Sequence, residues 1–74
     1  MNVNEKIGKI IREARLEKKM TMKELGKRVG VAESTIHHYE MGERGMSLET
    51  FFNICQILNL DVNEVLKQCR KTLD

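Results

Sequence analysis

The stretch TMKELGKRVGVAESTIHHYEMG, residues 21–42, contains the features that decide the fold. Thr21 is followed three residues later by Glu24, which is the spacing of a capping box at the start of a helix. Gly30 lies where the chain must reverse direction, and glycine adopts a positive φ without steric cost. The stretch therefore predicts a helix that starts at Thr21, a tight turn at Gly30 and a second helix over residues 33–40.

Two sets of side chains give these helices an inner and an outer face. The apolar residues that would hold the helices together are Leu25, Val29, Val31 and Ile36. The polar residues that the second helix would present outward are Glu33, Ser34, His37 and His38. We therefore expect a helix-turn-helix over residues 21–41, in which the first helix braces a second that can lie in a DNA major groove.

At these positions the chain resembles the Cro/repressor-type (XRE-like) helix-turn-helix family of bacteria and their phages. The family pattern is I-G-x-x-I-R-x-x-R, then T-x-x-x-L-A, then G-V-x-x-x-x-I-x-x-x-E-x-G, then S-L-x-x-L-x-x-I-x-x-x-L. The residues at matching places are Ile7, Gly8, Ile11, Arg12, Arg15, Thr21, Leu25, Gly30, Val31, Ile36, Glu40, Gly42, Ser47, Leu48, Ile54 and Leu58. The resemblance covers residues 7–66, and it implies a lambda-repressor-like DNA-binding domain: an all-α, compact bundle of five helices.

Length and composition limit the classes of protein to which the chain can belong. With 74 residues there is room for one domain, 1–74, and little volume for a deep catalytic pocket. No Ser/His/Asp, Cys/His or paired-carboxylate arrangement suggests catalysis, so we expect no enzyme. The apolar stretches are far shorter than the roughly 20 residues that span a bilayer, and no secretory signal is evident. We expect a cytoplasmic protein, bacterial or phage by its resemblance, that makes no membrane contact.

Neither the cysteines nor the histidines are spaced as metal ligands. Cys55 and Cys69 lie far apart and outside any C-x-x-C motif, which argues against a disulfide framework or a zinc site. His37 and His38 are adjacent, and adjacent helical residues point about 100° apart. We expect neither a metal nor a cofactor.

Charge is distributed unevenly along the chain. Between residues 5 and 28 nine basic residues oppose four acids, whereas residues 29–66 contain one basic residue, Arg44, and six acids. The nine are Lys6, Lys9, Arg12, Arg15, Lys18, Lys19, Lys23, Lys27 and Arg28. A basic patch of this kind is typical of phosphate binding, although it is also consistent with ordinary solvated helix surface.

Two further helices are expected on either side of the helix-turn-helix. The first, over residues 4–18, carries Ile7, Ile11 and Ala14 on one buried face. Ile10 lies beside that face, where it either packs against the C-terminal helix or forms an exposed contact. The second, over residues 48–59, begins after Ser47 as N-cap and ends in a left-handed turn at Asn59. Its apolar residues, Phe51 and Phe52 among them, are expected in the core.

A last helix over residues 61–73 begins with a second capping pattern, D-x-x-E. It carries more apolar residues than one helix of so small a core needs to bury: Val62, Val65, Leu66, Cys69 and Leu73. We therefore expect this stripe to form a homodimer interface, or alternatively to dock another protein.

The resemblance also implies roles for individual residues. Arg15 and Glu40 match an arginine and a glutamate that pair in the family and hold the recognition helix at a fixed tilt. The family register places base contacts at Glu33, Ser34 and His38. The phosphate contacts are expected at Lys23, Thr35, His37 and Arg44.

Three positions within the helix-turn-helix depart from the family pattern, and the loop over residues 42–46 lacks a frequent proline and carries Glu43 near the expected phosphate path. Met22 stands where a phosphate-binding glutamine is frequent, and Gly26 replaces an alanine. Ala32 occupies the place of the Ser or Thr that usually caps the recognition helix, so no side-chain oxygen is available there. These changes weaken the expectation of tight binding and leave the expected fold unchanged.

The function implied is a sequence-specific DNA-binding transcriptional regulator, repressor-like and dimeric on a palindromic operator in double-stranded DNA. The alternative is a protein-interaction subunit, such as the antitoxin half of a toxin–antitoxin pair. Salt-sensitive DNA binding would favour the first, and insolubility without a co-expressed protein partner would favour the second.

Overall fold

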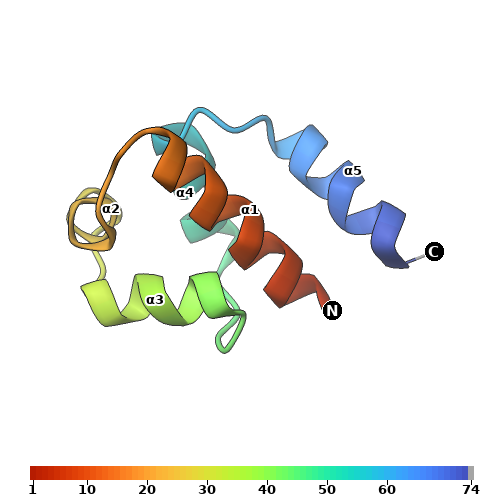
Figure 1. Ribbon diagram of the computed structural model, residues 1–74, viewed down its shortest axis with the longest axis horizontal. Coiled ribbons are helices and arrows are strands. Elements are labelled where there is room, and N and C mark those ends of the chain that lie inside the picture. The colour runs from red at the N-terminus through yellow and green to blue at the C-terminus, as the bar shows by residue number, and fades with distance from the viewer. Residues whose placement is uncertain (74) are drawn as a thin grey trace.

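Five helices make up the part of the chain that the computed structural model describes, which is residues 1–73, with side chains as far as residue 71 (Figure 1). They are α1 (Val3–Glu17), α2 (Met22–Val29), α3 (Glu33–Met41), α4 (Leu48–Ile57) and α5 (Val62–Leu73). The predicted all-α bundle of five helices is confirmed, and residues 1–73 contain no strand. Helix α1 contacts both α3 and α5, while α2 packs against α3 and α4.

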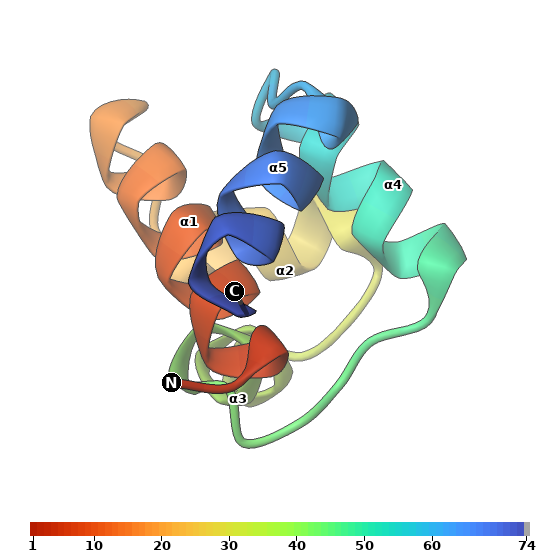
Figure 2. The ribbon, with the colours of Figure 1, turned by 90° about the vertical axis from the view of Figure 1, so that its right-hand side faces the viewer.

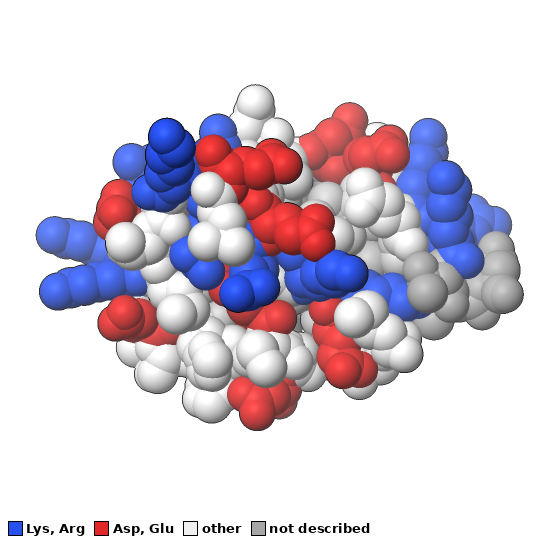
Figure 3. Space-filling model, in the orientation of Figure 1, with Lys and Arg blue, Asp and Glu red and all other residues white. Residues whose placement is uncertain are grey.

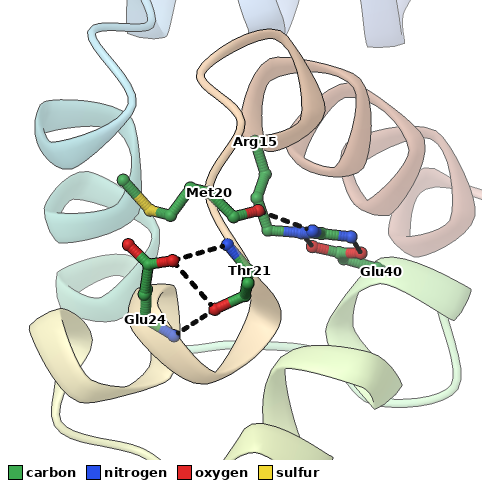
Figure 4. A network of polar contacts seen from close by, with 5 residues as sticks. All are labelled: Arg15, Met20, Thr21, Glu24 and Glu40. Carbon is green, nitrogen blue, oxygen red and sulfur yellow. Dashed lines mark hydrogen bonds and ion pairs between the residues drawn. The ribbon is translucent and has the colours of Figure 1, made fainter.

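Polar side chains fix where the helices begin. Thr21 accepts from the backbone N–H of Glu24 at 3.0 Å, and the Glu24 carboxylate accepts from the Thr21 N–H at 3.3 Å, which is the capping box expected from the sequence (Figure 4). Asn2 and Glu5 form the same reciprocal pair, so α1 begins at Val3 rather than at the expected residue 4. Ser47 caps α4 by accepting from the N–H of Thr50 at 3.1 Å.

Left-handed residues follow the ends of four helices, and Lys19 (φ 55°) is the one after α1. Gly30 (φ 90°) ends α2 at the predicted turn, and Gly42 (φ 74°) ends α3. Asn59 adopts φ 56°, and the turn that leads to it ends α4 at Ile57, two residues before the predicted end. Each of these turns reverses the chain over a few residues, which brings the helices into contact.

The core has two parts that meet around α4. The main cluster joins α1, α2, α3 and α4 through Ile11, Leu25, Ile36 and Ile54, each at most 1% exposed. The second cluster joins α4 to α5 through Phe51, Cys55, Val65 and Cys69, and Ile10 packs against it as the first of the two expected alternatives. Phe52 was expected in the core and is 47% exposed, because neighbouring helical residues point about 100° apart and Phe51 occupies the inner side.

Two glycines allow the helices to approach closely. A Cβ on Gly8 would lie 2.5 Å from the carbonyl oxygen of Glu40, so α1 and α3 meet backbone to backbone. A Cβ on Gly26 would lie 2.8 Å from the carbonyl oxygen of Val31, at the turn between α2 and α3.

None of the helices in the part of the chain that the structure describes has the length and apolar character that a membrane span requires.

Candidate nucleic-acid interface

Helix α3 has one face inside the molecule and one face open. Ile36, Tyr39 and Glu40 are buried where α3 packs against α1 and α2. The exposed residues are Glu33, Ser34, His37, His38 and Met41. Figure 1 shows α3 along one edge of the molecule, and the turned view of Figure 2 places it at the same edge, so its outer face is accessible.

The Arg15 side chain fixes the end of α3 from the opposite side. Its Nε donates to Oε2 of Glu40 at 2.7 Å and its Nη2 donates to Oε1 at 3.0 Å (Figure 4). Its Nη1 donates to the carbonyl oxygen of Met20 at 2.8 Å, just before α2 begins. The two side chains are buried, at 8% and 3% exposed. One guanidinium therefore links α1, the start of α2 and the end of α3 inside the protein.

The first turn of α3 has no side-chain cap. Ala32 is the N-cap residue and forms no side-chain hydrogen bond, as its sequence predicts. Glu33 and Ser34 lie exposed in this turn, and Thr35 is half-buried beside them. Their placement leaves the N-terminal end of the helix open for contacts with a ligand.

His38 has an acidic partner that the sequence pattern did not reveal. Its Nδ1 lies 2.9 Å from Oε1 of Glu43, in the turn after α3. His37 lies edge-on to His38, with the ring centroids 5.7 Å apart and the ring planes at 64°. The two rings consequently differ in environment, since His38 is held by a carboxylate.

The predicted phosphate contacts lie in different surroundings. Lys23 is exposed in the first turn of α2. His37 lines a hollow of about 680 Å³ between α1 and α3, whereas Arg44 lines a different groove beside α4. Lys9 and Arg12 of α1 line the same hollow as His37. Their positive charge was the sequence signal for both, and Arg12 also matches the family pattern. Two acids also line it, of which Glu5 caps α1 and Glu40 is paired with Arg15.

Positive charge near α3 comes from its neighbours. The sequence of α3 contains no Lys or Arg and includes two glutamates. On the face shown in Figure 3 the lower edge, where α3 lies in Figure 1, is formed by uncharged and acidic side chains. Lys and Arg gather above this edge and toward both ends of the same face. Attraction to a polyanion therefore depends on the Lys and Arg residues of α1, α2 and α5 rather than on α3 itself.

The residues predicted for a dimer interface fall into two groups. Val65 and Cys69 are 3% and 4% exposed inside the second core cluster, so they are not accessible to another chain, which corrects that part of the prediction. Val62 is half-buried and Leu66 is 50% exposed, while the side chain of Leu73 lies outside the described residues. The apolar stripe exceeded the expected need of the core because α5 buries more of its surface against α4 and α1 than we expected.

A separate apolar groove opens between α4, α5 and the start of α1. It has a volume of about 550 Å³, and its exposed apolar residues are Leu48, Phe52 and Leu66. Asn4, Ile7 and Met46 complete its floor, and Arg44 lies at its edge. An apolar groove of this kind is typical of a surface that contacts another protein.

Both cysteines belong to the core. Burial raises the pKa of the Cys55 thiol, and burial raises the pKa of Cys69 with a smaller opposing effect from the nearby Lys6 ammonium. Lys6 is itself buried, and its Nζ donates to the carbonyl oxygen of Cys69 at 3.5 Å. Both thiols are free in the structure, and a raised pKa favours their neutral, unreactive form.

Known proteins share this arrangement. A family model described as helix-turn-helix matches residues 11–65. An uncharacterized HTH-type transcriptional regulator of Archaeoglobus fulgidus is 36% identical over 55 residues, which cover 74% of this chain and 78% of that protein. Two crystal structures of the clp gene regulator ClgR from Corynebacterium glutamicum are similar, with TM-scores of 0.88 and 0.86 at 25% and 24% identity. The first match covers 97% of this chain and 77% of that one, and the second 100% and 96%.

The buried Arg15–Glu40 pair, the left-handed turn at Gly30 and the exposed face of α3 define a helix-turn-helix DNA-binding domain. The chain belongs to the Cro/repressor-type (XRE-like) helix-turn-helix family of transcriptional regulators.

Proposed function

We propose that this regulator acts as a repressor and binds a palindromic operator as a homodimer, with α3 in the major groove. The observation that carries the proposal is the polar outer face of α3, which is exposed along its length while its inner face is fixed to α1 and α2. A domain that covers its site on DNA acts most directly by keeping other proteins off that site. The protein would do so in the cytoplasm, on the genome.

Three residues of α3 are proposed to contact bases. Glu33 and Ser34 lie in the open first turn, and His38 lies one turn further along the exposed face. A carboxylate accepts from cytosine N4, a hydroxyl donates or accepts, and an imidazole does either according to its protonation. Together these groups would distinguish base pairs across one half-site.

Phosphate contacts are proposed at the margins of α3. Lys23, Thr35, His37 and Arg44 keep the role expected from the family register, and we add Lys9 and Arg12 because they border the same hollow as His37. Since α3 has no Lys or Arg, most of the salt-dependent affinity would come from the cations of neighbouring segments, which are Lys9, Arg12, Lys23 and Arg44.

The homodimer is proposed to form through the apolar groove. Leu48, Phe52 and Leu66 expose large apolar surfaces there, at 67%, 47% and 50%. The two helices beside it differ in net charge, because the one charged residue of α4 is Glu49, whereas α5 carries Lys67, Arg70 and Lys71 against a single acid, Glu64. A two-fold contact that lays α4 of one copy beside α5 of the other would therefore pair unlike charges twice.

The position of the groove suits a dimer on DNA. Figure 2 looks at the face that contains α4 and α5, and α3 lies at its lower edge. A two-fold axis running vertically through that face would leave both copies of α3 at the same edge. Two recognition helices on one edge are able to enter successive major grooves about 34–36 Å apart.

Selection of bound sequences from a random duplex library, at two salt concentrations, tests this function. The proposal predicts a palindrome whose half-sites are separated by about one helical turn, with affinity that falls steeply as salt rises. Enrichment of a single, non-repeated motif would contradict the dimer, and the absence of any enriched motif would contradict sequence-specific binding.

The apolar groove also supports the second candidate, a protein-interaction subunit such as an antitoxin. In that case the groove would bind a different protein, and the purified chain would remain monomeric on DNA. Sedimentation of the intact protein on its operator distinguishes the two candidates.

A further inference from the structure

The turn after α3 holds the Glu43 side chain beside His38. Gly42 is left-handed, and the backbone N–H of Glu43 then donates to the carbonyl oxygen of His38 at 3.0 Å. This is the hydrogen bond that closes a helix end of the Schellman type. The same residue therefore contacts His38 twice, through its backbone and through a carboxylate oxygen 2.9 Å from Nδ1.

The carboxylate determines which ring nitrogen carries the proton. An ionised glutamate only accepts hydrogen bonds, so Nδ1 of His38 must donate to it. In a neutral imidazole the other nitrogen, Nε2, then has no proton and is an acceptor. The His38 side chain is 47% exposed, and Nε2 is the ring nitrogen left for a ligand.

We infer that Glu43 is a positioning residue for base recognition, because it holds His38 in the tautomer whose Nε2 accepts a hydrogen bond. The base that suits an acceptor is one with an exocyclic amine in the major groove, adenine N6 or cytosine N4. Guanine and thymine present acceptors at the corresponding positions. They would form no hydrogen bond with an unprotonated Nε2, because it is also an acceptor. The inference rests on the proposed function, since it requires His38 at a base edge.

Removal of Glu43 should change what His38 offers to the DNA. Without the carboxylate, the neutral ring is free to carry its proton on Nε2 and to donate to guanine or thymine. The His38 side chain would then also lose its fixed orientation in the DNA major groove. The expected result is a loss of discrimination at one base pair of each half-site, with affinity for the remaining positions retained.

Nitrogen chemical shifts of the imidazole rings test the tautomer without DNA. At about pH 8.5, above the range in which histidine usually gains a proton, the wild-type spectrum should show His38 with Nδ1 protonated and Nε2 unprotonated. In Glu43→Ala the proton should move to Nε2 in a large part of the population. His37 in the same spectrum and the variant Glu17→Ala, at an exposed position of α1, are controls, and neither should change. An Nε2-protonated His38 in the wild type, or an unchanged tautomer in Glu43→Ala, would overturn the inference.

Affinities for operator variants at the His38 position provide the second test. Glu43→Ala should reduce the preference for adenine or cytosine there by about three- to tenfold, which is the effect of one hydrogen bond, and testing all four bases shows which amine is bound. Glu43→Gln should fall between the wild type and Glu43→Ala, because its amide is able to accept from Nδ1 but also to donate to it. If His38→Ala abolishes the preference while Glu43→Ala preserves it, the inference fails and the proposed base contact stands. If His38→Ala has no effect, the base contact itself is wrong and the inference fails with it.

Discussion

The guanidinium of Arg15 binds both carboxylate oxygens of Glu40, at 2.7 and 3.0 Å, across 25 residues of sequence. The same guanidinium donates to the carbonyl oxygen of Met20, so every strong contact it makes joins two helices or their ends. Because the pair is buried, removal of one partner would leave the other as an uncompensated charge. The tilt of the recognition helix therefore depends on a brace that does not itself face DNA.

Substitution of this brace should be strongly destabilising. Arg15→Ala is expected to lower the free energy of unfolding by about 3–5 kcal/mol, the range for a broken buried pair. Arg15→Lys, which keeps the charge without the fork, should lose less and remain folded. Urea denaturation of Arg15→Lys, Glu40→Gln and the double variant gives the coupling energy, and strictly additive effects would show that the two residues do not act as a pair.

Gly8 should be intolerant of any side chain. Its Cβ position lies within 2.5 Å of the Glu40 carbonyl oxygen, and backbone cannot move aside as a flexible side chain can. Gly8→Ala is expected to destabilise the fold by about 1–3 kcal/mol, the usual effect of overpacking. Gly45→Ala is the matched control, because its nearest neighbour would be a side-chain atom at 3.5 Å, and its midpoint in urea should hardly change. Equal midpoints for the two variants would contradict the close approach of α1 and α3.

The uncapped start of α3 offers a stabilising change. Ala32→Ser supplies the missing acceptor for a backbone N–H in the first turn and should raise stability by about 0.5–1 kcal/mol. Thr21→Ala removes an existing cap and should lower stability by a similar amount. Thermal unfolding midpoints should thus move in opposite directions, and a lower midpoint for Ala32→Ser would count against the proposed role of the cap position.

The groove between α4 and α5 should control the oligomeric state. Leu66→Glu puts a charge into the proposed two-fold contact, and we expect a folded monomer with weakened operator affinity. Gln56→Glu adds the same charge at an exposed position of α4 that does not line the groove, and it should leave the dimer intact. Sedimentation that finds the wild type monomeric, both free and on DNA, would refute the dimer through this surface.

Local patterns predicted the helix starts and turns well. The capping box at Thr21 and the left-handed Gly30 depend on residues three or four positions apart, so the sequence contains the whole interaction. The cap at Asn2 has the same spacing, but we placed the start of α1 from its apolar periodicity, which begins only at Ile7. Interactions between residues three or four positions apart can therefore be predicted from the sequence.

Burial and long-range contacts were less predictable. Periodicity assigned Val65 and Cys69 to the apolar face of α5, but it does not state whether a neighbour within the chain covers that face. Arg15 and Glu40 were paired through the family resemblance, and no local rule predicts their burial. The contact between His38 and Glu43 depends on the left-handed turn at Gly42, whose geometry positions a side chain five residues away.

The affinity of His38→Ala for single-base-pair variants of the selected operator tests the central claim most directly, namely that His38 on the outer face of α3 contacts a base. The expected result is a loss of about 1–3 kcal/mol on the best site and a relaxed preference at one base pair of each half-site. Lys23→Ala, measured in parallel, should weaken all variants alike and reduce the salt slope by about one. If His38→Ala leaves the ranking of operator variants unchanged, the base contact of His38 is contradicted.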